Sequence, residues 1–139
     1  MPFQKDSELK FRFTYDFSEQ GGAVSAIDLT PQLHSLEAGL IVKSMYIEVE
    51  TALDSAGSPT VTIGDGDDAD GYFADFYSLA GSNNAVINSS EVAGALIWDD
   101  TNDHQIYHRI GANAGMQMTV GTAALTAGKF TLIVECVKA

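Results

Sequence analysis

The sequence has a single cysteine, Cys136, and so it cannot form an internal disulfide. A chain of 139 residues does not need covalent cross-links, because a domain of this size buries about 68% of its unfolded surface. Hydrophobic residues make up 45% of the sequence, which argues against intrinsic disorder. The composition therefore predicts one globular domain.

Positive charge is scarce. Seven Lys and Arg residues stand against nineteen Asp and Glu residues, and the formal net charge is −12. Binding to nucleic acid or to an anionic membrane requires clustered cations, so we expect neither partner. The excess of acid favours solubility and mutual repulsion of free copies. Attraction to a basic partner surface or to divalent cations is the alternative interpretation.

Long hydrophobic runs are also missing. No segment approaches the ~18 apolar residues of a membrane span, and Met1–Glu8 lacks the apolar stretch of a signal peptide. We expect synthesis in a cytoplasm. We also expect residues 1–8 to form a polar N-terminal arm and residues 9–139 to form the folded domain.

Alternation of apolar and polar residues is the pattern that the sequence does contain. In Leu9–Phe17 every second residue is leucine, phenylalanine or tyrosine, which predicts a strand with one buried face. A longer strand begins after Gly39, and Lys43 interrupts its pattern near the start. The residues of this strand predicted to point inward are Ile41, Met45, Ile47, Val49 and Leu53.

Further strand patterns recur along the chain, with turn residues between them. Thr30–Gly39 begins with a threonine and a proline, which predicts a turn or one short helical piece. Short strands and almost no helix predict a single-domain antiparallel β-sandwich of the jelly-roll type. The other predicted strands are Ala23–Leu29, Thr60–Ile63, Val92–Trp98, Gln105–Ile110, Met116–Val120 and Phe130–Val137.

Three motifs in the central segment resemble those of a known group of proteins. Glu48–Leu53 ends the long strand, Thr60–Gly66 forms the next strand and its turn, and Asp68–Tyr72 closes an acidic loop. Together they resemble small virion proteins of tailed bacteriophages, which are jelly-roll or β-sandwich proteins that decorate, cement or carry fibres on the capsid. The resemblance is strongest over Ala38–Phe76. It implies a virion structural protein whose partner is the major capsid protein or another virion protein, and it favours a homotrimer.

The acidic loop, Gly64–Gly71, is the best candidate for a metal site, because calcium takes several oxygen ligands. The EF-hand pattern fails, since the fifth position from Asp65 is Ala69 and the twelfth is Phe76 rather than glutamate. A solvated Asp-Gly turn is the more ordinary use of such a sequence. We therefore predict no metal and no cofactor, while the residues that would bind calcium are Asp65, Asp67, Asp68 and Asp70. A second acidic group is interpreted as a turn: Asp99, Asp100 and Asp103.

No arrangement of residues predicts catalysis. The Gly-X-Ser-X-Gly motif and a phosphate-binding glycine-rich loop are both absent. His104 and His108 would lie about 13 Å apart on a strand at ~3.3 Å per residue, too far to share a zinc ion unless the chain bends. Cys136 falls at an inward strand position, where a thiol acts as a small hydrophobe. We expect a protein without enzymatic activity.

Aromatic residues leave one alternative function open. An aromatic platform could bind a sugar, as in a carbohydrate- or host-surface-binding β-sandwich module. Core packing or a subunit interface is the more ordinary use of such residues. The residues concerned are Tyr72, Tyr77, Trp98 and Tyr107.

The last strand indicates an interface. Ile133 and Val137 are apolar and lie on the face opposite to Phe130 and Leu132, so either another part of the fold or another subunit is expected to cover them. Contact between the subunits of a cyclic homo-oligomer would bury them. The N-terminal arm is a candidate tether that orders on docking. The interface candidates are Phe3, Lys5, Ile133 and Val137, and the expected location is the capsid surface of a virion.

Overall fold

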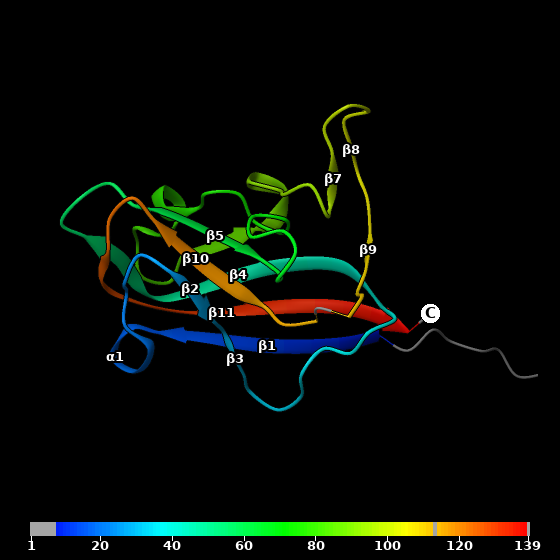
Figure 1. Ribbon diagram of the computed structural model, residues 1–139, viewed down its shortest axis with the longest axis horizontal. Coiled ribbons are helices and arrows are strands. Elements are labelled where there is room, and N and C mark those ends of the chain that lie inside the picture. Colours follow the sequence, from blue (N-terminus) through cyan, green and yellow to red (C-terminus); the bar gives the residue numbers. More distant parts are fainter. Residues whose placement is uncertain (1–7, 113, 139) are drawn as a thin grey trace, which may run out of the picture.

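The computed structural model describes residues 8–112 and 114–138, and it is built from two antiparallel sheets (Figure 1). The larger sheet has six strands in the order β3-β1-β11-β4-β6, and β9 also pairs with β4. This arrangement confirms the predicted all-β sandwich. The strands of the larger sheet are β1 (Glu8–Asp16), β3 (Thr30–Pro31), β4 (Leu40–Ser55), β6 (Val86–Asn88), β9 (His108–Arg109) and β11 (Leu125–Lys138).

The smaller sheet has three strands in the order β2-β10-β5. A separate two-stranded hairpin, β7–β8, extends away from both sheets (Figure 1). The strands are β2 (Ala26–Asp28), β5 (Thr60–Gly64), β7 (Trp98–Asp99), β8 (His104–Gln105) and β10 (Gln117–Gly121). The helical turns are α1 (Phe17–Gln20), η1 (Tyr77–Ala80) and η2 (Ser89–Glu91). In the described ranges, no helix has the length and apolar character needed to cross a membrane.

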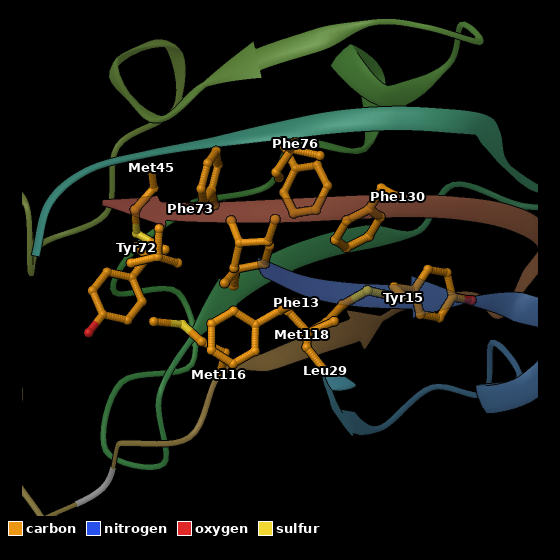
Figure 2. Packing of buried hydrophobic residues seen from close by; sticks show 14 of the residues in the cluster. Phe13, Tyr15, Leu29, Met45, Tyr72, Phe73, Phe76, Met116, Met118 and Phe130 are labelled. Atoms are coloured by element: carbon orange, nitrogen blue, oxygen red, sulfur yellow. The ribbon is translucent and has the colours of Figure 1, made fainter. Parts of the chain in front are cut away.

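The core lies between the two sheets and follows from the alternation of the long strands. Phe130 of β11 pairs with Tyr15 of β1 on one side and with Val49 of β4 on the other, and all three side chains are buried. The ring of Phe130 lies 5.4 Å from that of Tyr15 and 5.8 Å from that of Phe76, measured between centroids. Figure 2 shows these rings together with Phe13 and the methionines that fill the same layer.

The long strand β4 contains a bulge that the sequence pattern did not predict. Cys136 pairs with Val42 and Glu135 pairs with Ser44, so Lys43 is an extra residue without a partner on β11. An extra residue reverses the alternation of side chains on its strand. The prediction that Ile41 points inward was therefore wrong, because Val42 is fully buried in its place. The other four residues of that prediction are buried in the core.

Three segments differ from their predictions. Thr30–Gly39 forms bends and turns rather than the short helical piece that was the other prediction, and its first two residues form β3, which was not predicted, at the edge of the larger sheet. Val92–Ile97 does not form a strand, because the backbone N–H groups of Gly94 and Leu96 donate to the carbonyls of Tyr72 and Gly71. The segment therefore curls around the end of the acidic loop. The predicted strand Gln105–Ile110 is broken into β8 and β9.

Candidate partner-binding surface

The face of the larger sheet that points away from the core carries mixed side chains. Ile133 is fully buried, yet it does not belong to the core cluster between the sheets. Its register partners are Arg12 on β1 and Tyr46 on β4, so the cover over Ile133 comes from side chains on this outer face. Polar residues flank it, since Lys10, Glu135 and Ser44 pair across the same three strands. We call this the outer sheet face.

A groove of about 480 Å³ lies where β1 begins and β11 ends. The side-chain amide of Gln105 donates to the carbonyl of Lys43 at 3.1 Å, which anchors the segment beside the groove to the bulge in β4. Tyr107 is 60% exposed beside it. The groove combines charged and apolar lining, which suits contact with a protein better than enclosure of a small molecule.

The predicted interface residues fall in different places. Val137 is half-buried and lines the groove together with Glu8, the first described residue. Ile133 is already covered within the chain. Phe3 and Lys5 lie outside the described residues. The groove therefore brings Val137 together with Tyr107, which the sequence suggested only as part of an aromatic platform or an interface, and with Lys43, which was not among the predicted interface residues.

The acidic loop forms a structured turn between β5 and the aromatic residues that follow. Asp65 is only 7% exposed, and its Oδ1 accepts the backbone N–H groups of Asp67 and Asp68, each at 2.9 Å. Its Oδ2 lies 3.9 Å from Nε2 of His108, which joins the loop to β9. The Asp65 carboxylate is thus used in holding the loop together.

The calcium candidates do not gather into one ligand set. A hydrogen bond between the side chains of Asp68 and Asp70 raises the pKa of Asp68, and burial and the charge of Asp70 raise it further. Across residues 8–112 and 114–138, no three His, Cys, Asp or Glu side chains converge as a metal site would require. The loop is therefore best described as a capped Asp-Gly turn.

The two histidines that lie four residues apart have different acidic neighbours. His104 Nε2 lies 3.7 Å from Asp99 Oδ2 in the hairpin, whereas His108 faces Asp65 and packs its ring edge-on against Tyr72 at 5.6 Å. Burial, with the nearby Asp65 carboxylate, raises the pKa of Tyr72. Each histidine therefore lies beside a different carboxylate.

Cys136 is not an activated nucleophile, and the four candidate aromatic residues do not form a platform. Burial raises the pKa of Cys136 to about 11, so its thiol is protonated near neutral pH and is a poor nucleophile. Tyr72 is 1% exposed and belongs to the core, whereas Tyr107 is exposed beside the groove. The four aromatic residues considered for a sugar platform therefore do not form one surface.

The chain matches no protein-family model and no curated protein. Solved structures do match. A chain of the cyanophage Pam1 capsid asymmetric unit aligns at a TM-score of 0.65 and 17% identity, over 100% of this chain and 91% of that chain. A chain in the acid-stable capsid structure of Helicobacter pylori bacteriophage KHP30 aligns at a TM-score of 0.52 and 16% identity, over 94% of this chain and 86% of that chain. A chain of the capsid of Ralstonia phage GP4 aligns at a TM-score of 0.56 and 16% identity, over 97% of this chain and 85% of that chain.

All three structures are phage capsids. At this level of identity the likeness establishes a shared fold. It covers at least 94% of this chain in each case, so both sheets are included rather than one hairpin or one layer. The matched chains are only slightly longer than this one, because the alignment also covers 85% or more of each of them.

Proposed function

We propose that this protein is a non-enzymatic structural component of a tailed-phage virion that binds the capsid surface as a decoration, cement or head-fibre protein. The observation that carries the proposal is the full-length fold match to small chains within three phage capsids. A chain of this size encloses little volume of its own, so an accessory position on a shell built from a larger coat protein suits it.

The outer sheet face and its groove are the surface we assign to the contact with the coat protein. Glu8, where the described chain begins, lines the groove together with Val137 and Tyr107. An arm that orders on docking adds contact area to a mixed apolar and polar patch. Repeated weak contacts from a symmetric oligomer then add up to firm attachment through high effective concentration. A homotrimer is the assembly we favour.

Removal of residues 1–7 tests the role of the arm without shortening β1. The truncated protein should keep its cooperative unfolding transition and lose at least tenfold in affinity for coat shells that lack the accessory protein. Cosedimentation with such shells measures the occupancy. The double variant Phe3→Ala, Lys5→Ala should show a smaller loss in the same direction. Equal occupancy of the truncated and full-length proteins would exclude the arm as a tether, and failure of the full-length protein to bind any shell would remove the proposed function.

A further inference from the structure

The larger sheet has an open edge along the first half of β1. Of the described strands, only β3 lies beside β1 on this side, and it pairs with Phe13 and Thr14 alone. One further bond extends the pairing, from the backbone N–H of Gln32 to the carbonyl of Arg12 at 3.0 Å. The chain then leaves the sheet, so no described strand lies beside Glu8–Phe11 on this side (Figure 1).

Backbone groups without partners line this edge. In a strand, the N–H and C=O of one residue point to the same side, and the side alternates along the chain. The carbonyl of Arg12 points toward the β3 side, so both groups of Lys10 and the carbonyl of Glu8 point there as well. The same alternation keeps them out of the ladder with β11, and no other described residue bonds to them. An antiparallel strand placed beside them would satisfy all three, because its residue opposite Lys10 would exchange two hydrogen bonds.

The side chains along the edge are cationic on one face and apolar on the other. Lys10 and Arg12 are exposed on the outer sheet face, and neither forms an ion pair in the described chain. Phe11 points to the other face and is half-buried. It lines a shallow pocket of about 100 Å³ at the edge together with Leu33, which is 89% exposed. The edge therefore offers positive charge beside an apolar depression.

The charge on this edge selects its partner. A second copy joined edge to edge about a two-fold axis at Lys10 would place two lysines opposite each other, and like charges so placed destabilise a sheet. Lysine on an edge strand is a common guard against such pairing of identical chains. A segment that carries a carboxylate opposite Lys10 is attracted instead, and Arg12 lies diagonal to the same position.

We propose that an extended segment of the coat protein adds to this edge as a further strand, antiparallel to β1. The segment carries an acidic side chain opposite Lys10 and, on its other face, an apolar side chain that enters the pocket at Phe11 and Leu33. In this mode of recognition main-chain hydrogen bonds supply affinity and alternate side chains supply specificity. The edge borders the groove, because Lys10 lines both. The inference rests on the proposed function and adds the conformation and chemistry of the coat-protein segment.

Two variants at one position separate the backbone bond from the charge. Lys10→Gln removes the positive charge and keeps the N–H, and it should lower the affinity for coat shells about threefold. Lys10→Pro also removes the N–H, and it should lower the affinity about tenfold further. Proline is tolerated on an edge strand where the N–H points outward, so β1 should still form. Cosedimentation with shells that lack the accessory protein measures both affinities.

The matched control lies on the opposite edge of the same sheet. The N–H of Val49 donates to the carbonyl of Ala85 at 2.8 Å, so the N–H of the next residue, Val86, points away from β4. The side chain of Val86 is 64% exposed. Val86→Pro therefore places the same ring at a second open edge, and it should leave the affinity for shells within twofold of wild type. Urea unfolding should show a cooperative transition for both proline variants.

Hydrogen exchange in the wild-type protein tests the inference without any substitution. The amide of Lys10 should exchange rapidly in the free protein, whereas those of Leu9 and Phe11 point toward β11 and should be protected. Binding to shells should slow the exchange of Lys10 at least tenfold and leave its two neighbours unchanged. Electron-transfer fragmentation of the digested protein gives the residue resolution that this comparison needs.

Equal affinity of Lys10→Pro and Lys10→Gln, or an unprotected Lys10 amide in shell-bound protein, would overturn the inference and leave the proposed function standing. Protection of Lys10 in the absence of shells would also overturn it, because a second copy of this chain would then occupy the edge. Failure of the wild-type protein to bind any shell would instead remove the proposed function, and this inference with it.

Discussion

Gly64 shows how one residue without a side chain allows the acidic loop to close. The loop folds back so that the carbonyls of Asp68 and Ala69 lie directly over the Gly64 Cα. A methyl group there would collide with the Asp68 carbonyl oxygen, and both partners are backbone atoms that cannot rotate away. The position of Asp65, and with it the contact to His108, therefore depends on the small size of its neighbour.

Replacing Gly64 with alanine should destabilise the protein by about 1–3 kcal/mol, the range expected when extra volume is forced into a packed site. The matched control is Gly115→Ala, where an added Cβ meets nothing within 4 Å. That variant should be neutral or slightly more stable, since alanine restricts the unfolded chain. Urea unfolding monitored by fluorescence gives both midpoints. Identical midpoints for the two variants would contradict the loop geometry.

Other single residues mark the limit of what the sequence could predict. Lys43 interrupts the apolar alternation, and this was the one local sign of the bulge that turns Val42 inward. Ile133 stood out as an apolar residue on the polar face, but its neighbours across the sheet, Arg12 and Tyr46, come from distant parts of the chain. Register between strands was not readable from the sequence, so cover from within the fold could be expected but the neighbouring residues could not be named.

At the scale of elements, long strands were predicted well and short ones poorly. β1, β4 and β11 repeat the alternation over many residues, and their pattern outweighs local exceptions. Two-residue strands such as β8 and β9 exist because their backbones meet β7 and β4, which is a tertiary effect. The acidic loop was predicted as a solvated Asp-Gly turn, whereas Asp65 is buried; the hydrogen bond between Asp68 and Asp70 and the contact of Asp65 with β9 required the structure.

The end of β1 provides a prediction about pH. Asp16 begins the turn α1, and its carboxylate accepts hydrogen bonds from the hydroxyl and the backbone N–H of Ser18 at 2.7 and 3.0 Å. These bonds, side chain first, lower the pKa of Asp16, and Lys129 at 3.9 Å lowers it further. A lowered pKa means that the folded state binds fewer protons, so stability is present above the unfolded pKa of about 3.9 and is lost as the pH falls through the folded value.

The melting temperature should therefore fall as the pH drops from 5 to 3, and the fall should be shallower in Asp16→Asn, which keeps the cap without the charge. Asp99 contributes with the same sign, because hydrogen bonds from Asn102 lower its pKa. Asp68 contributes with the opposite sign, since its raised pKa favours the protonated fold and its contribution is lost as the pH rises. Thermal melts at closely spaced pH values measure the slopes. An unchanged slope in Asp16→Asn would show that the carboxylate does not support the fold.

At the scale of the whole molecule, the informative features are the distribution of charge and the complete fold. The larger sheet carries every described cation and has an equal number of acids, whereas the remaining surface is acidic. The net charge of −12 was visible in the sequence, but its segregation was not, because it depends on which strands share a sheet. The capsid assignment depends in turn on the complete fold, since the identity to the matched capsid chains is only 16–17%.

The central claim is that this chain is an accessory structural protein on a tailed-phage capsid. Quantitative mass spectrometry of purified, tail-separated phage heads whose genome encodes the chain tests it most directly. The account predicts the protein in the head fraction in a fixed ratio to the coat protein, and its release under mild conditions that leave the shell intact. Its absence from purified heads, or its presence only in the soluble lysate, would contradict the claim.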